Sequence, residues 1–292
     1  MTRPFPSAVL LAACVLPAML AGLVVTVPAR AAQGEAGCTG FVDSVPVVIQ
    51  ASGTWCLRKD LNTAQVVGAA IDIRANNVVL DCNHFKLGGM AAGAGTEAVG
   101  IILQSLHNVT VRRCNVRGFR IGLKFGGGQS SGHLVEDNRF EGNTVAGLTV
   151  IGEGSIVRRN RVLDTGGSTA GSANAVGISL LGGVDAIDNT IDTVVARAGS
   201  GGSAYGISSL ENRDVSLSGN RIRGVVADGV SQAYAIYHGS WRAVMRDNDL
   251  SGTGVGTGMS CSDGDARAKG NLINGFATPL ANCSDDGNFS QP

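Results

Sequence analysis

Residues 176–191 read VGISLLGGVDAIDNTI, and this pattern recurs along most of the chain. It opens on a glycine and an apolar residue, Gly177-Ile178, and closes on an asparagine and an apolar residue, Asn189-Thr190-Ile191. The glycine half recurs at Gly100, Gly122, Gly147 and Gly206, and more loosely at Ala235 and Gly258; the asparagine half recurs at Asn115, Asn138, Asn160, Asn220, Asn248 and Asn271. A fixed-order repeat of this length is typical of a solenoid.

Each repeat divides into three short strands: one at the glycine, one before the asparagine and one after it. Side chains alternate between the faces of a strand, so Val99, Ile101 and Leu103 are expected to share the inner face. The same alternation places Tyr205 and Tyr234 inside. The turn at the asparagine keeps a constant length, which favours a stacked asparagine column that satisfies buried backbone groups. We therefore predict an all-β parallel β-helix of about eight three-strand coils.

The N-terminal 31 residues have the features of an export signal. Arg3 is followed by an apolar run from Ala8 to Val27, and Ala29-Arg30-Ala31 matches a small-x-small cleavage site. The alternatives are a membrane anchor and lipidation at Cys14. We expect residues 1–31 to be removed, leaving no membrane span, and the mature protein to be secreted or periplasmic.

Composition and cysteine number narrow the class of protein further. The formal net charge is 0, so no basic excess exists to neutralise nucleic-acid phosphates. Without Cys14, an even number of cysteines remains, which suggests disulfides in an exported chain. Stacked strands lie roughly 4.8 Å apart, within the range that a disulfide tolerates. Matching repeat positions then predict the pairs Cys82–Cys114 and Cys261–Cys283, which leaves Cys38–Cys56 in the N-terminal region.

The glycine and asparagine columns resemble those of the right-handed parallel β-helix proteins of the pectate-lyase-like superfamily, of the exported bacterial type. The resemblance extends over about residues 40–285. It implies a cap and linker at 32–70 and a β-helix with a C-terminal cap at 71–292. It also implies where substrate would lie, because enzymes of this superfamily bind it along the outer face of the glycine strand, between the variable loops.

The outward column two residues after each glycine reads Ile102, Lys124, Thr149, Ser179, Ser208, Tyr237 and Ser260, and it contains no carboxylate. Calcium-dependent lyases need acidic ligands and hydrolases need paired acids, so the column argues against both chemistries. Aromatic faces and arginine suit sugar stacking and carboxylate binding. We therefore select Lys124, Tyr237, Trp241 and Arg242 as candidate polysaccharide-binding residues. Tyr237, Arg242 and His238 are the candidate catalytic groups, although alternation points His238 inward.

An acidic pattern recurs near the C-terminus, as Asp263 and Asp265 after Cys261 and as Asp285 and Asp286 after Cys283. Stacking would bring these carboxylates together, and Ca²⁺ suits oxygen-rich turns. We favour a solvated polar cap without a metal or other cofactor, with calcium as the alternative.

Two functions follow from these residues. The first is an exported protein that binds or scaffolds extracellular or periplasmic polysaccharide. The alternative is a carbohydrate-active enzyme, similar to polysaccharide lyases, that acts on an acidic polysaccharide with Tyr237 as base and Arg242 as carboxylate neutraliser. The residues leave open whether the protein is catalytic, which glycan it takes and its oligomeric state.

Overall fold

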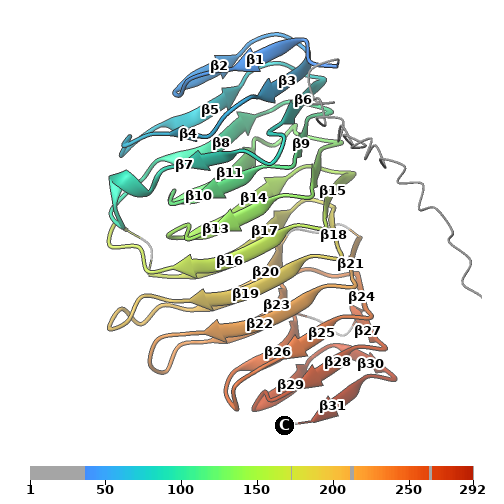
Figure 1. The fold of residues 1–292 in the computed structure, drawn as a ribbon. Coiled ribbons are helices and arrows are strands. Elements are labelled where there is room, and N and C mark those ends of the chain that lie inside the picture. Colours follow the sequence, from blue (N-terminus) through green and yellow to red (C-terminus); the bar gives the residue numbers. More distant parts are fainter. Residues whose placement is uncertain (1–36, 172, 211–213, 263–264, 292) are drawn as a thin grey trace, which may run out of the picture. The chain divides into compact units, whose positions relative to one another are not determined.

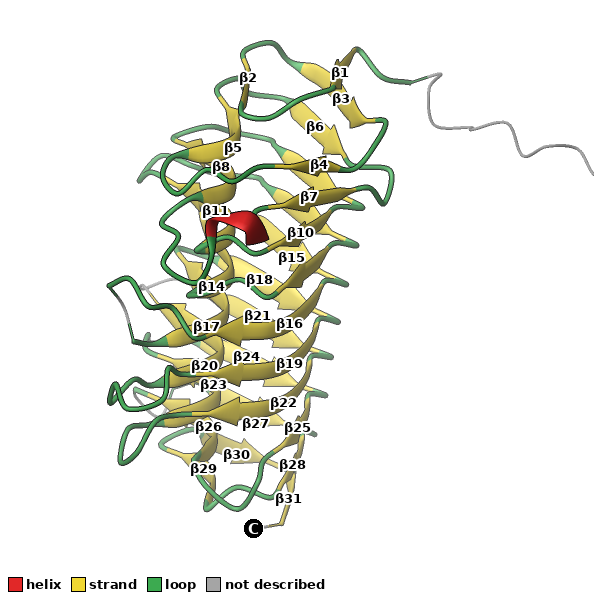
Figure 2. Ribbon diagram, turned by 60° about the vertical axis from the view of Figure 1, so that its left-hand side comes forward, coloured by secondary structure: helices red, strands yellow, loops and turns green. Residues whose placement is uncertain are grey.

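The computed structural model describes residues 37–171, 173–210, 214–262 and 265–291. Three parallel sheets wind about one axis in about nine turns, so the predicted β-helix of three-strand coils is confirmed (Figure 1). One short 3₁₀ helix, η1 (Met90–Ala92), accompanies the described strands (Figure 2). The predicted export signal at 1–31 and Cys14 lie outside the described residues.

Sheet A contains eleven strands: β1 (Gly40–Val42), β3 (Gly53–Leu57), β6 (Val78–Asp81), β9 (Thr110–Arg112), β12 (Leu134–Glu136), β15 (Ser155–Arg158), β18 (Val184–Ile187), β21 (Val215–Ser218), β24 (Ala243–Arg246), β27 (Arg267–Lys269) and β30 (Ser284–Asp286). Sheet B, which carries the glycine column, contains ten: β2 (Val47–Ile49), β5 (Ala69–Ile73), β8 (Val99–Gln104), β11 (Ile121–Gly126), β14 (Ala146–Ile151), β17 (Ala175–Leu181), β20 (Ala204–Leu210), β23 (Ala233–His238), β26 (Thr257–Cys261) and β29 (Thr278–Ala281).

Sheet C follows the asparagine turn and also contains ten strands: β4 (Leu61–Asn62), β7 (Lys86–Gly88), β10 (Asn115–Arg117), β13 (Arg139–Glu141), β16 (Arg161–Gly166), β19 (Thr190–Val195), β22 (Arg221–Val226), β25 (Asp249–Ser251), β28 (Leu272–Asn274) and β31 (Phe289–Gln291). The described part of 32–70, the predicted cap and linker, contributes β1 to β4 to the three sheets. The core lies between the sheets, where one inward apolar column from each sheet meets the others.

The glycine of each sheet B strand interrupts the alternation of side chains. Strand pairing steps from Ile121 to Leu123 and omits Gly122, and both Gly122 and Leu123 are buried while Ile121 is half-buried. The residue before each glycine therefore faces outward, whereas the glycine and the residue after it face the core. The expectation that Val99 shares the inner face with Ile101 is wrong for this reason, because a local bulge shifts the phase by one residue.

A hydrogen-bonded asparagine ladder runs along the turn between sheets A and C. In each step, the side-chain oxygen of one asparagine accepts the backbone N–H and side-chain amide of the asparagine one coil earlier, as Asn189 does for Asn160 at 3.0 and 3.1 Å. The ladder comprises Asn138, Asn160, Asn189, Asn220, Asn248, Asn271 and Asn288. Asn115 is not a member, contrary to expectation. Cys114 holds its place, and the Cys114 N–H donates to Asn138.

The three predicted disulfides are confirmed. Cys38–Cys56, Cys82–Cys114 and Cys261–Cys283 are bonded, with Cα–Cα distances of 5.9, 4.7 and 5.1 Å. The last two join adjacent coils, as the repeat predicts. Cys38–Cys56 fastens the first described coil and Cys261–Cys283 fastens the last ones, whereas Cys82–Cys114 lies further along the solenoid, with coils on both sides.

Candidate functional site

Three tyrosines gather on the outer face of sheet B, over β20 and β23. Tyr205 and Tyr234 precede the glycine position, are in register, and stack with ring centroids 5.6 Å apart. Tyr237 joins them at 5.9 Å from Tyr205 and 5.3 Å from Tyr234. The expectation that Tyr205 and Tyr234 point inward is therefore wrong, because the bulge at Gly206 and Ala235 turns them outward.

The three residues of this tyrosine cluster (Tyr205, Tyr234 and Tyr237) are half-buried, and their rings pack against one another. Burial raises the pKa of Tyr234, and interaction with Tyr205 and Tyr237 raises it further. The Tyr234 phenol is therefore a neutral hydrogen-bonding group at physiological pH. An aromatic face with a polar rim suits contact with the apolar face and hydroxyls of a sugar.

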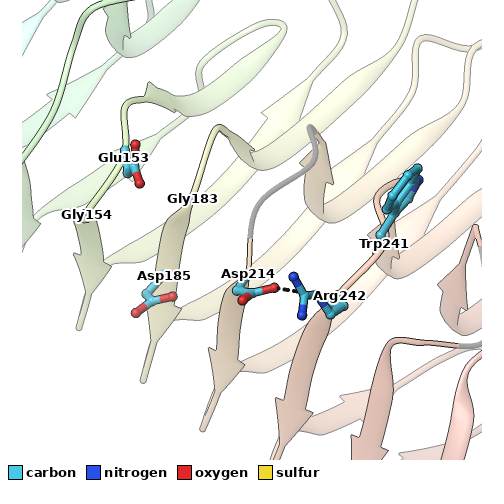
Figure 3. A pocket seen from close by; sticks show the side chains of 7 residues that line it. All are labelled: Glu153, Gly154, Gly183, Asp185, Asp214, Trp241 and Arg242. Carbon is cyan, nitrogen blue, oxygen red and sulfur yellow. Dashed lines mark ion pairs between the residues drawn. The ribbon is translucent and has the colours of Figure 1, made fainter.

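A groove of about 510 Å³ lies where the chain leaves sheet B for sheet A, over several successive coils (Figure 3). It is lined by Glu153, Gly154, Gly183, Asp185, Asp214, Trp241 and Arg242. Trp241 is 64% exposed, so its indole is available to a ligand. The Arg242 Nε lies 3.0 Å from Asp214 Oδ1, so this exposed guanidinium is already ion-paired (Figure 3).

The structure brings some predicted residues together and separates others. Trp241 and Arg242 line the groove, whereas Tyr237 belongs to the tyrosine cluster on the preceding strand. Lys124 lies on β11, and β14, β17 and β20 separate it from Tyr237 on β23. His238 is fully buried and its Nδ1 lies 3.3 Å from Ser209 Oγ, so the inward direction expected for it is confirmed.

Sequence reasoning missed the carboxylates of the groove. Glu153 and Asp214 come from the connections into β15 and β21, and Asp185 comes from β18; none of them belongs to the outward column of sheet B. The prediction that this column has no carboxylate is wrong at its N-terminal end, because Asp72 is in register with Ile102. Asp72 forms an ion pair with Arg74. The register of the repeat could have placed Asp72 in this column from the sequence. It gives no comparable indication of the groove carboxylates.

The acidic C-terminal residues behave as separate surface groups where they are described. Asp285 accepts hydrogen bonds from Asn288, and Asp286 lies 3.7 Å from the Lys269 ammonium. Asp265 is exposed, and Asp263 lies outside the described residues. Within the described ranges no three His, Cys, Asp or Glu side chains are grouped as metal ligands. The polar cap without a metal stays a prediction, with calcium as its untested alternative.

The chain belongs to the right-handed β-helix family: the model of the family described as "Right handed beta helix region" matches residues 47–193, about half of the chain. No curated protein matches it. Over the residues that the structure describes, no helix is long and apolar enough to cross a membrane.

Two tailspike proteins are among the solved structures to which this chain is similar. The Dettilon tailspike protein (gp208) is 15% identical with a TM-score of 0.56, over 86% of this chain and 53% of that one. A tailspike mutant of E. coli bacteriophage HK620, in complex with a pentasaccharide, is 10% identical with a TM-score of 0.48, over 84% and 53%. This chain thus spans about half the length of these proteins.

A third similar structure is the A-module of the mannuronan C-5 epimerase AlgE6 from Azotobacter vinelandii. It is 13% identical with a TM-score of 0.41, over 88% of this chain and 79% of that module. At 15% identity, the likeness to the Dettilon tailspike protein shows a shared fold and no shared activity.

Proposed function

We propose that this protein binds a polysaccharide outside the cytoplasm, with the tyrosine cluster and the neighbouring groove as its binding surface. The observation that carries the proposal is the packing of Tyr205, Tyr234 and Tyr237 on one outward face, within 5.3–5.9 Å of one another. Aromatics make up only 4% of the chain, and all three tyrosines gather here. Such rigid aromatic surface loses little conformational entropy on binding.

The charges of the groove favour a neutral sugar over an acidic one. Among the lining residues that the structure describes, Glu153, Asp185 and Asp214 provide three carboxylates and Arg242 provides one guanidinium. Arg242 is also engaged by Asp214, so neutralising a substrate carboxylate would require breaking that ion pair. An acidic polysaccharide would meet net repulsion in the groove unless a cation bridged the charges.

Three disulfides support a location in an oxidising compartment. Secretion or residence in the periplasm is therefore part of the proposal, and the predicted export signal at 1–31 is the segment that would direct it.

The second candidate function is a carbohydrate-active enzyme, and the groove supplies the observation that favours it. Asp185 and Asp214 lie on successive coils and line the same cavity as Trp241. Paired carboxylates beside a sugar-binding aromatic are the groups that glycoside hydrolysis uses. The alternative of a lyase acting on an acidic polysaccharide relies instead on Tyr237, which packs against Tyr205 and Tyr234, and on Arg242, which lines the groove.

One experiment tests both candidates: the mature, oxidised protein is incubated with a panel of neutral and acidic polysaccharides, with and without Ca²⁺. Retention of a polymer on the immobilised protein and the size of that polymer after incubation are both measured. Retention without shortening supports a binding protein, and shortening supports an enzyme. Neither retention nor shortening of any neutral or acidic polymer would contradict the proposal.

A further inference from the structure

A cluster of arginines lies at the turn between sheets A and C, separate from the tyrosine cluster and from the groove. A cavity of about 350 Å³ opens there, and its charged lining comprises His84, Arg113, Asp137, Arg139, Arg159 and Arg161. We call this set the arginine corner. Its residues come from four successive coils, and the two neighbouring strands β13 and β16 carry Arg139 and Arg161 (Figure 1).

Most of these arginines already have an acidic partner. Arg113 pairs with Asp81, and Arg159 pairs with both Asp137 and Glu136. Arg139 pairs with Glu141 at 2.8 Å. These pairs hold the guanidinium groups in place around the cavity.

Arg161 is the exception. It is exposed, its backbone N–H donates to the Asn138 carbonyl, and among the described residues its guanidinium has no ion-pair or hydrogen-bond partner. It is directly in register with Arg139 on the adjacent strand. Adjacent strands lie about 4.8 Å apart, and like charges directly opposite each other destabilise a sheet. The position therefore has unbalanced positive charge that an anion would compensate.

We propose that the arginine corner binds a tetrahedral oxyanion, a phosphate or sulfate group, between Arg139 and Arg161. Each guanidinium presents paired N–H donors, and a tetrahedral oxyanion offers a different oxygen edge to each of them. The group is supplied either by the free ion or by an ester on a polymer. Neither source involves the tyrosine cluster, so this proposal and the proposed polysaccharide surface can be tested independently of each other.

The test is calorimetric titration of the mature, oxidised protein with inorganic phosphate and with sulfate, at constant ionic strength maintained with chloride. The Arg161→Gln variant removes the charge without breaking a contact. We expect it to weaken phosphate binding by at least about fivefold, as charge-assisted hydrogen bonds are lost.

The chain offers a matched control in Arg221→Gln. Arg221 occupies the same column two coils further on and is 53% exposed, but it pairs with Asp249. We expect phosphate affinity to be unchanged in this variant. A second variant, Asp137→Asn, removes the carboxylate from the cavity lining while Arg159 retains Glu136. It should bind phosphate more tightly than the wild type.

The source of the oxyanion is distinguished by comparing dextran sulfate with uncharged dextran and with free sulfate. If dextran sulfate binds much more tightly per site than sulfate does, and if Arg161→Gln loses this advantage, the oxyanion is an ester on a polymer. Equal affinities identify the free ion. The proposal is overturned if the wild type binds neither phosphate nor sulfate saturably. It is also overturned if the wild type and Arg161→Gln bind these ions with equal affinity.

Discussion

The glycine of each repeat is required by space rather than by backbone conformation. A Cβ on Gly147 would lie 2.4 Å from a methyl of Val162 and 2.6 Å from the Gly177 carbonyl oxygen. Neither neighbour can withdraw, because Val162 is fully buried in the core and Gly177 belongs to the next strand of sheet B. The φ of Gly147 lies outside the left-handed region, so backbone strain is not the reason that this position is a glycine.

We predict that Gly147→Ala lowers the free energy of unfolding by about 1–3 kcal/mol, the usual cost of overpacking a core. The matched control is Gly128→Ala, because a Cβ on Gly128 meets no atom within 4 Å. The measurement is urea unfolding of both variants under oxidising conditions. Equal stability changes in the two would mean that crowding is not what selects the glycine.

His133 makes the stability of the fold sensitive to mild acid. Burial, together with repulsion from His107, lowers the pKa of His133 to about 4. Its Nδ1 accepts the Val109 N–H at 3.3 Å, so the neutral ring is the form that fits. The unfolded chain takes up this proton near pH 6.5, whereas the folded chain takes it up near 4. Stability is therefore lost as pH falls through this window, by up to about 3 kcal/mol.

The variant His133→Asn keeps an acceptor for Val109 and removes the titrating ring. We predict that the loss of unfolding free energy between pH 7 and pH 4.5 is smaller in this variant than in the wild type. Chemical unfolding at the two pH values measures the difference. Asp81 is present in both proteins and so does not affect their difference; burial raises its pKa, but the Arg113 and Asn83 hydrogen bonds and the nearby arginine charges together hold it below the usual range. An identical loss in both proteins would contradict the assignment.

At the scale of the structural element, the asparagine ladder is the device that fixes the turn into sheet C. Asn189 accepts the Asn160 N–H, and it donates to the Val157 carbonyl and to Asn220. Asn115 lies beside the ladder and contributes none of these bonds.

We predict that Asn189→Ala lowers the free energy of unfolding by about 2–4 kcal/mol, because buried backbone groups lose their partners. Asn115→Ala should change it by less than about 1 kcal/mol, as expected where no ladder bond is lost. Thermal and urea unfolding of the two variants give the comparison. A loss at Asn115 as large as that at Asn189 would show that the ladder is not the source of the effect.

The sequence predicts the coils and the disulfides well, because both depend on columns that recur at matching positions. Cys82 and Cys114 could be paired from their places in successive repeats. The outward direction of Tyr234 could not be predicted, because strict alternation of side chains takes no account of the bulge at Ala235. Asn115 was misassigned since Cys114, directly before it, holds the ladder position. The groove carboxylates Asp185 and Asp214 were missed because the repeat does not constrain the residues around that turn.

At the scale of the whole solenoid, three sheets share one core and leave three kinds of outer surface. The outer face of sheet B carries the tyrosine cluster, and the turn into sheet A carries the acidic groove. The turn between sheets A and C carries the arginine corner. A neutral sugar is expected at the first two and an oxyanion at the third, so salt should weaken binding only at the arginine corner.

The central claim is that the tyrosine cluster binds polysaccharide, and the most direct test is calorimetric affinity for an oligosaccharide cut from the polymer that the protein retains. The wild type is compared with Tyr234→Ala and with Phe289→Ala, an exposed aromatic control on β31. Losing an aromatic anchor costs about 1–2 kcal/mol, so Tyr234→Ala should bind roughly fivefold to thirtyfold more weakly. Phe289→Ala should bind as the wild type does. Unchanged affinity in a folded Tyr234→Ala would contradict the account.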